Sequence, residues 1–195
     1  MAAGEKLFKA VQRNFFANFR VSVMLDSNGS NTTAAAGVAK LLSSGAIKGK
    51  KAVVLAGTGP VGQRAAIMLA KEGASEVIVS SRQLSRSAQA CADIKNSFDV
   101  DITPAEAADH DSRGKLIEGA NIVFATGAAG VELLKSEHWE NNSTIELMAD
   151  ANATPPIGIG GTDMMDRGQD RHGKIIWGAI GFGTLKLALH RACIE

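Results

Sequence analysis

The chain is poor in the residues that mark disulfide-rich, metal-binding and membrane proteins. Its two cysteines, Cys91 and Cys193, lie far apart and form no CxxC pair, so we interpret them as reduced thiols. Its four histidines are scattered without the spacing of metal ligands, and we expect no metal site. No apolar run approaches roughly 18 residues and no signal-peptide pattern stands at the start, so we expect a soluble, cytoplasmic protein with no membrane partner.

An excess of charge of either sign is also missing. The 195 residues carry 21 basic and 20 acidic side chains without a basic stripe, so no nucleic acid is expected as a partner. Hydrophobic residues make up 45% of the chain and charged residues 21%, a balance that favours a packed core over disorder. The length predicts one domain, or one domain with a smaller attached lobe.

Familiar motifs of hydrolytic catalysis are absent as well. Neither GxSxG nor HExxH occurs, and the adjacent Asp109, His110 and Asp111 stand in a polar stretch that we interpret as a solvated loop. Hydride transfer needs no acid–base pair when the substrate is ready to lose hydride, because positioning alone lowers much of the barrier. An oxidoreductase is therefore compatible with these absences.

What the chain does contain is an alternation of strand-like and helix-like patterns. Apolar, β-branched runs predict strands over 19–26, 50–57, 75–82, 99–104, 120–127 and 143–150. Amphipathic spacing predicts helices over 3–16, 31–42, 63–73, 84–98, 129–139 and 184–195, with a cap at Ser30 or Asn31 and a partly helical stretch at 106–119. The alternation predicts an α/β fold with a parallel sheet covered on both faces.

A glycine-rich turn follows the most apolar of these strands. It reads Gly57-Thr58-Gly59-Pro60-Val61-Gly62 and leads directly into a helix. In such a turn the first glycine permits the tight bend, the second lets a phosphate approach the backbone, and the third lets the helix pack closely on the strand. A helix N-terminus is a favourable site for a doubly charged pyrophosphate. The turn predicts a Rossmann-type, doubly wound dinucleotide-binding unit; the alternative is a glycine-rich turn in some other α/β protein.

The end of the second strand of this unit indicates which dinucleotide binds. NAD enzymes place an acidic residue there for the ribose 2′-hydroxyl, whereas this chain has Ser80, Ser81 and Arg82. Arg82 offers a fork of donors to a phosphate, and Arg86 stands one helical turn later. We therefore predict NADP as the cofactor. The alternative is that both arginines are solvated residues at a helix start.

Polar residues gather in two further places. The first group is Asp26, Ser27, Asn28, Ser30, Asn31 and Thr32, after the strand expected at 19–26. The second is Asp150, Asn152 and the turn Pro155–Gly158, after the strand expected at 143–150. Because ligands of open α/β sheets bind at the carboxyl ends of strands, both groups are candidates for substrate contact, as is Lys186 in the last helix. Turn and cap chemistry, or a solvated helix lysine, are the alternatives.

Four separated blocks of the sequence carry a resemblance to a known family. The blocks are residues 24–38, 48–62, 151–161 and 181–194. Together they resemble the NADP-dependent methylenetetrahydromethanopterin dehydrogenases of methylotrophic bacteria, some of which also use methylenetetrahydrofolate. The resemblance covers essentially the whole chain and is far more specific than the glycine turn alone.

The resemblance implies a reaction and a division of the chain. Hydride would pass from the methylene carbon between two pterin nitrogens to NADP⁺, leaving a methenyl cation delocalised over both nitrogens, so no proton need move in that step. It implies a Rossmann domain at 48–183, part of a smaller N-terminal substrate lobe at 1–47, and a C-terminal helix at 184–195 that returns to this lobe. It also suggests a homo-oligomer.

The resemblance also assigns residues to the cofactor and the tetrahydropterin substrate. By resemblance, the cofactor is held by Gly57, Gly59, Gly62 and Arg82, and near its nicotinamide half lie Thr126, Gly127, Ala128 and Asn152. The glycine turn and the end of the second strand add Thr58, Pro60, Val61, Ser81 and Arg86 as cofactor-binding candidates. Implied substrate-binding residues are Asp26, Asn28, Asn31, Asp150, Pro155, Pro156 and Lys186, with Lys186 also the candidate catalytic residue.

Two departures from the family and two competing functions complete the expectations. Family members extend beyond both ends of this chain, so we expect a truncated form. The family often has a lysine after the selector arginine where this chain has Gln83, so we expect weaker binding of the 2′-phosphate.

The competing functions are a shikimate-dehydrogenase-like NADP reductase and an NADP-binding fragment without turnover.

Overall fold

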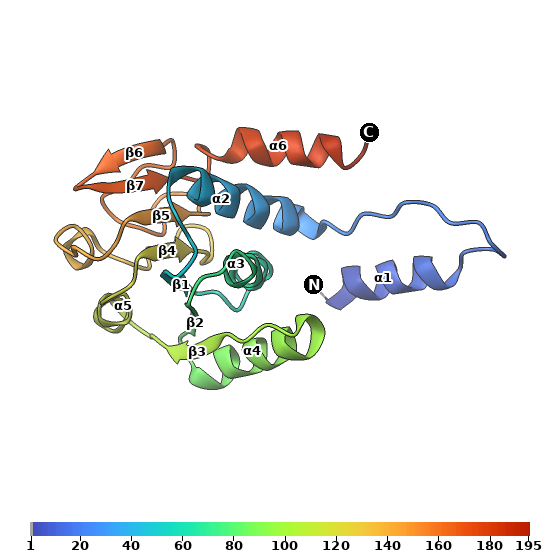
Figure 1. Cartoon of the computed structure of the whole chain (residues 1–195), viewed down its shortest axis with the longest axis horizontal. Helices are drawn as coiled ribbons and strands as arrows, with labels where there is room; N and C mark the ends of the chain where they lie inside the picture. Colours follow the sequence, from blue (N-terminus) through green and yellow to red (C-terminus); the bar gives the residue numbers. More distant parts are fainter. Residues whose placement is uncertain (1) are drawn as a thin grey trace.

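A seven-stranded sheet forms the centre of the computed structural model, which describes residues 2–195 (Figure 1). The strands run in the order β3-β2-β1-β4-β5-β7-β6, and every neighbouring pair is parallel except β6 and β7. Their bounds are β1 (Lys51–Leu55), β2 (Glu76–Ser81), β3 (Thr103–Glu106), β4 (Ile122–Ala125), β5 (Leu147–Asp150), β6 (Arg167–Arg171) and β7 (Lys174–Trp177). The predicted Rossmann-type α/β fold is confirmed.

Helices cover both faces of this sheet. They are α1 (Ala2–Arg13), α2 (Ser30–Ser44), α3 (Pro60–Lys71), α4 (Leu84–Phe98), α5 (His110–Leu116) and α6 (Gly183–Ala192), with short 3₁₀ turns η1 (Ser27–Gly29) and η2 (Ser136–His138). Among the described residues, no helix combines the length and apolar character needed to cross a bilayer.

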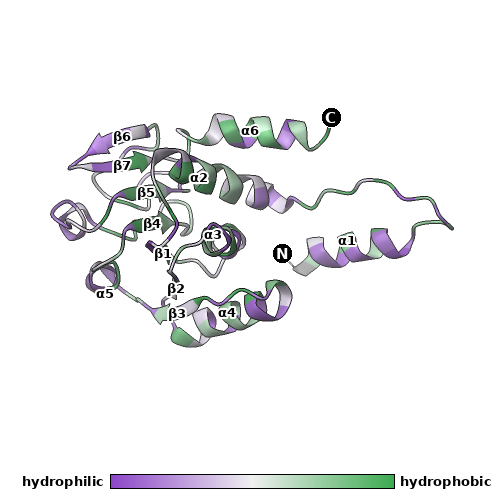
Figure 2. Cartoon of the chain, viewed as in Figure 1, coloured by the Kyte–Doolittle hydropathy of each residue, from purple (hydrophilic) through white to green (hydrophobic). Residues whose placement is uncertain are grey.

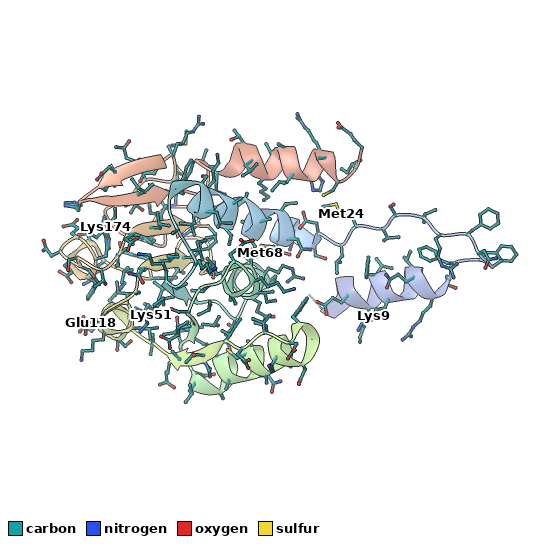
Figure 3. All side chains as sticks on the ribbon, in the orientation of Figure 1. Lys9, Met24, Lys51, Met68, Glu118 and Lys174 are labelled. Atoms are coloured by element: carbon teal, nitrogen blue, oxygen red, sulfur yellow. The ribbon has the colours of Figure 1, made fainter. Side chains whose placement is uncertain are left out.

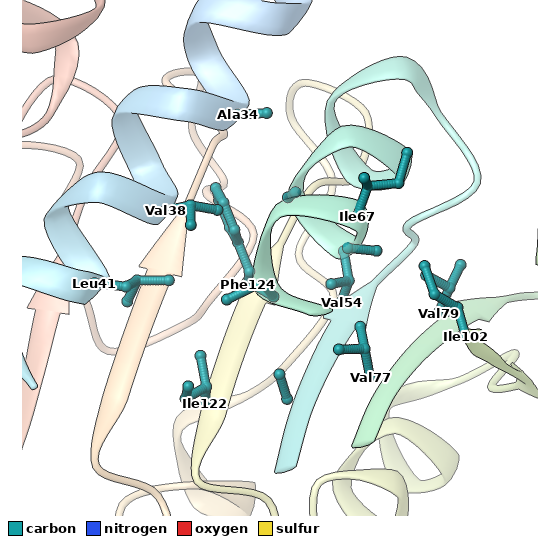
Figure 4. Close-up of a cluster of buried hydrophobic side chains, with 14 of the residues drawn as sticks. Ala34, Val38, Leu41, Val54, Ile67, Val77, Val79, Ile102, Ile122 and Phe124 are labelled. Atoms are coloured by element: carbon teal, nitrogen blue, oxygen red, sulfur yellow. The ribbon is translucent and has the colours of Figure 1, made fainter. Parts of the chain in front are cut away.

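Alternate side chains of the strands pack into two separate hydrophobic clusters, one on each face of the sheet, because both faces are buried. Val54 of β1 faces α2 and α3, whereas its neighbours Val53 and Leu55 face the opposite layer around Trp139. On the first face, Val38 of α2 points toward Phe124 of β4 (Figure 4). Because α2 shares this core with α3, the expected boundary at residue 47 runs between elements that pack together.

The strand order reverses at the centre of the sheet. β1 leads on to β2 on one side, whereas its neighbour β4 leads on to β5 on the other side, so the connections from the carboxyl ends of these two strands run in opposite directions. This is the topological switch point at which open α/β sheets bind ligands. The glycine turn after β1 lies at that point.

The strand predicted over 19–26 is wrong. The segment is extended but pairs with no strand among residues 2–195, and it forms an arm that runs away from the sheet (Figure 1). Phe19 is 75% exposed and Val21 68% exposed, and the arm's side chains lie far from the strands (Figure 3). Figure 2 shows apolar and polar residues interspersed along it. Alternating apolar residues favour an extended backbone, but a strand also needs a neighbouring strand to hydrogen-bond with, and this segment has none among residues 2–195.

The helix predicted over 129–139 is also wrong. Gly130 has a left-handed φ of +72°, and Leu134 forms an isolated bridge with Ile159. The amides of Leu133 and Leu134 both donate to the carbonyl oxygen of Gly158. These bonds to the loop after β5 replace those of a helix, so only Ser136–His138 closes a 3₁₀ turn. The apolar spacing reflected burial against the sheet rather than helical geometry.

The hairpin formed by β6 and β7 was not predicted. β6 reads Arg-Gly-Gln-Asp-Arg and lacks an apolar face, because it is the edge strand. Its turn is formed by His172 and Gly173, whose φ values of 54° and 74° are those of a two-residue hairpin turn. Both signals are local, yet neither was included among the predicted elements.

Candidate functional site

The glycine turn places the N-terminus of α3 at the carboxyl end of β1. Gly59 is the N-cap, and Pro60 takes the first helical position, where an amide proton would lack a partner. A Cβ added to Gly59 would meet no atom within 4 Å, so its backbone is open to an approaching group. A Cβ on Gly62 would lie 2.4 Å from the Cα of Gly57, so only glycine lets the helix approach the turn this closely.

The structure corrects the expected role of Gly57. The left-handed residue of the turn is Ala56, with a φ of 51°, whereas Gly57 has no positive φ. Gly57 is required for space, because its Cβ would lie 2.9 Å from Cγ1 and 3.0 Å from the carbonyl oxygen of Val54. The turn is tied to β2, since the Ala56 amide donates to Ser80 Oγ at 3.2 Å and the Gly57 amide to the Ser80 carbonyl oxygen at 3.0 Å.

Beside the turn lies a pocket of about 230 Å³ between the ends of β2, β3 and β4. It brings together six of the expected cofactor residues: Thr58, Ser81, Arg82, Arg86, Gly127 and Ala128. Thr126 packs differently, because its hydroxyl donates to the carbonyl oxygen of Leu55 at 3.1 Å. The pocket therefore combines a cationic wall with an apolar one formed by Val131 and Leu133.

A third arginine of this pocket, Arg113, was missed by the sequence analysis. It lies on α5, which Asp109 begins with a capping box to Ser112. Asp109, His110 and Asp111 had been interpreted as a solvated loop, within a stretch at 106–119 that was expected to be partly helical. A helix placed soon after the third strand would have predicted that Arg113 lies beside the end of the sheet.

The polar group before α2 is organised around Asp26. Its carboxylate accepts hydrogen bonds from the Asn31 amide at 2.7 Å and the Thr32 hydroxyl at 2.8 Å. Burial alone would raise the pKa of Asp26, but these bonds, together with those from the Thr32 amide and His190, outweigh it and lower the pKa. Asp26 thus satisfies the start of α2, where a cap by Ser30 or Asn31 had been expected and where Gly29 is the N-cap.

The side chains of this group divide between internal bonds and an open hollow. Asn31 donates to the carbonyl oxygen of Leu25 and accepts from Arg64 Nε, so its amide is engaged within the protein. Asn28 instead lines a hollow of about 570 Å³ together with Pro60, Val61, Gly127 and Ala129. This hollow, which Arg64 also lines, adjoins the glycine turn but includes neither Arg82 nor Arg86.

Lys186 of α6 also reaches the start of α2. Its Nζ lies 3.0 Å from the position that a Cβ on Gly29 would occupy. It lines a second hollow of about 390 Å³ with Thr33, Ala151 and Arg167. Lys186 therefore lies between the Asp26 group and the loop that follows β5.

Asp150 and Asn152 shape that loop rather than face a cavity. Asp150 is 1% exposed and accepts from the amides of Asn152 and Ile159, each at 2.9 Å. Asn152 is 4% exposed, donates to Pro156 and accepts from the Thr154 amide. Pro155 and Pro156, joined by a cis bond, are exposed at the tip. We therefore expect both polar side chains to act by positioning the loop, in place of the direct ligand contacts expected from the sequence.

Asp150 should make the stability of the protein depend on pH. Burial raises the pKa of its carboxyl to about 6, although the amides of Asn152, Ile159 and Gly158 oppose this. A raised folded pKa stabilises the fold below the unfolded pKa of about 3.9, and this contribution is lost as the pH rises through 6. We expect the free energy of unfolding to fall by roughly 2 kcal/mol between pH 4 and 6.

Urea denaturation across this range measures the effect, with Asp150→Asn as the comparison. The variant cannot ionise at this position, so its stability should vary less with pH even though it is lower throughout. Parallel pH profiles for the two proteins would assign the dependence to other groups.

Two relatives of known name match the chain in sequence, while no family model matches it. The bifunctional protein MdtA of Methylorubrum extorquens is 56% identical over 196 aligned residues, covering 100% of this chain and 68% of that protein. The NAD(P)-dependent methylenetetrahydromethanopterin dehydrogenase of the same organism is 33% identical, covering 78% of this chain and 54% of its own length. The chain thus spans only part of each relative.

Solved structures share the fold at lower sequence identity. Shikimate 5-dehydrogenase from Listeria monocytogenes, solved with shikimate and NAD, superposes with a TM-score of 0.56. The match is 14% identical and covers 83% of this chain and 57% of the enzyme. At this identity the likeness extends to the Rossmann-type fold alone.

Proposed function

The chain belongs to the methylenetetrahydromethanopterin dehydrogenase family, and we propose that it transfers a hydride from the methylene carbon of a methylene-tetrahydropterin to NADP⁺. The product is the methenyl form of tetrahydromethanopterin or tetrahydrofolate. This proposal places the protein in one-carbon metabolism as an oxidoreductase acting on a CH–NH donor. We further propose that it is cytoplasmic and homo-oligomeric, as expected from the sequence and the family resemblance.

One geometric observation carries the proposal. The arginine-lined pocket and the hollow beside Asn28 meet at Gly127 and flank the same glycine turn. A dinucleotide whose pyrophosphate rests on the turn would therefore have its adenosine end among the arginines and its other end beside Asn28. That is the arrangement needed to bring a cofactor and a polar substrate together.

The residues present fit NADP. The open backbone at Gly59 and the amides at the start of α3 suit a pyrophosphate, while the end of β2 offers Arg82 and no carboxylate to a 2′-phosphate. When bound, NADP⁺ supplies the hydride acceptor. The chain's own contribution is to hold both partners in register and to exclude water from the cleft.

The chain offers few groups for proton transfer, and the proposed step requires none. The methenyl cation spreads its charge over two nitrogens, so positioning of the substrate is the main demand on the protein. Asn28, Pro155, Pro156 and Lys186 are the proposed substrate-facing residues, and Lys186 is the proposed catalytic residue. In this proposal residues 1–47 belong to the substrate lobe, 48–183 form the NADP-binding domain and 184–195 return to the lobe.

The test is spectroscopic. The protein is mixed with NADP⁺ and either methylene-tetrahydromethanopterin or methylene-tetrahydrofolate, and absorbance of the reduced nicotinamide is followed. A rise that requires the methylene-pterin supports the proposal. NADP binding without turnover would instead identify a binding module, and turnover on shikimate alone would identify a shikimate-dehydrogenase-like reductase.

Gln83 gives a smaller prediction about cofactor preference. It is the N-cap of α4 and directly follows Arg82, at a position where the family often has lysine. We expect Gln83→Lys to tighten NADP binding several-fold through one added cation, with little change for NAD; surface charge pairs contribute roughly 0.2–1 kcal/mol each. Titration with both cofactors measures this, and equal gains for the two would contradict a 2′-phosphate at this position.

A further inference from the structure

Arg113 lies between the loops that follow β3 and β4, at the wall of the arginine-lined pocket. Its guanidinium donates to the carbonyl oxygen of Ala108 at 2.8 Å and to that of Leu133 at 3.1 Å. These two bonds tie together two walls of the pocket. A guanidinium carries five N–H donors in a fixed plane, so donors remain beyond these two bonds.

This guanidinium is a buried cation without an adjacent carboxylate. The residue is 8% exposed, and no ion pair within 4.0 Å among residues 2–195 includes it. Burial lowers the pKa of Arg113; Asp109 opposes the shift and the charge of Arg82 adds to it. A buried charge is costly unless it is paired, and two like charges around one pocket add to that cost. A bound anion would relieve both.

We propose that Arg113 is a specificity-determining residue that helps to select a 2′-phosphorylated adenine nucleotide. The inference rests on the proposed function and adds a third cation to the pair expected from the sequence. Arg82 and Arg86 approach from the end of β2 and the first turn of α4, whereas Arg113 approaches from α5. The 2′-phosphate is thus recognised from two sides of the pocket.

Binding of nucleotide fragments tests this without requiring turnover. Calorimetry compares the affinities for 2′,5′-ADP and 5′-AMP in the native protein, Arg113→Met, Arg113→Lys and a matched control, Arg13→Met, which removes an exposed arginine of α1. We expect Arg113→Met to weaken the binding of 2′,5′-ADP at least about tenfold, because a charge-assisted bond to the 2′-phosphate is lost. The binding of 5′-AMP, which lacks this phosphate, should weaken less than about threefold. Arg113→Lys should retain most of the preference, and the control all of it.

The outcomes separate the inference from the proposed function. A native protein without preference for 2′,5′-ADP would contradict NADP as cofactor. A native preference that Arg113→Met leaves intact, or equal losses for both fragments, would overturn the role of Arg113 alone.

A further variant covers the case in which Arg113→Met does not fold. Asp109→Asn keeps a good helix cap and removes the carboxylate whose charge opposes that of Arg113. The preference for 2′,5′-ADP should then rise about twofold, and an unchanged or reduced preference would overturn the inference.

Discussion

Replacing Gly62 with alanine is expected to abolish NADP binding and to destabilise the fold by about 3 kcal/mol or more. The new Cβ would lie 2.4 Å from Gly57 Cα and 2.6 Å from the Gly57 carbonyl oxygen. Both are backbone atoms, so no side chain can rotate to make room. The start of α3 must therefore move away from β1, which displaces the amides proposed to bind the pyrophosphate.

Gly59→Ala is the matched comparison within the same turn. Its Cβ would meet no protein atom within 4 Å, and Gly59 has a φ of −78° that alanine adopts freely. The stability should fall by less than about 1 kcal/mol, the cost of alanine at an N-cap. NADP binding should nevertheless weaken at least about tenfold, because the methyl group occupies the space through which the phosphate approaches.

Thermal unfolding measures the stability of the two variants, and cofactor titration measures their affinity for NADP. The expected pattern is a large loss of stability only in Gly62→Ala and a loss of affinity in both. If Gly59→Ala bound NADP as tightly as the native protein, the pyrophosphate would lie elsewhere and the proposed function would lose its structural basis.

Some segments of the fold could be predicted from the sequence because the signals that determine them lie close together in the chain. The segment from β1 to β2 carries its information locally: an apolar strand, glycines at the required spacing and an alanine-rich helix. The segment 129–139 does not, because its backbone is satisfied by Gly158 in a loop far along the chain. Single-sequence patterns register burial but not the partner that provides it, which is also why the arm at 19–26 was taken for a strand.

The candidate site divides in the same way. Arg82 and Arg86, which line the pocket, could be proposed from the sequence because the missing acidic residue at the end of β2 is a local signal. Arg113 was missed because its place in the pocket depends on the packing of α5. Asp150 was correctly placed at the carboxyl end of a strand, yet its burial beneath the loop 151–159 follows from the hydrogen bonds it accepts. The position of a residue at the end of a strand can be predicted from the sequence. Whether its side chain is exposed there can be decided only from the folded structure.

Arg82→Met is expected to weaken NADP binding about 100-fold while changing NAD affinity less than about threefold. A bidentate bond from a guanidinium to a phosphate contributes roughly 3 kcal/mol when it is partly desolvated, and this interaction exists only with the 2′-phosphate. Arg82 lines the pocket with Arg86, so some affinity for NADP should remain in the variant. Methionine preserves the length and apolar stem of the side chain, which limits the change to the lost cation.

Titration with NADP and NAD at two salt concentrations measures this effect, with Arg191→Met as a control that removes an exposed cation of α6. The NADP preference of the native protein and of the control should diminish with added salt, because exposed charges are screened, and that of Arg82→Met should change less. Equal affinities for NADP and NAD in the native protein would contradict Arg82 as the selector. Since no carboxylate at the end of β2 favours NAD, its ribose would then have to be bound by Ser81 or the loop after β4.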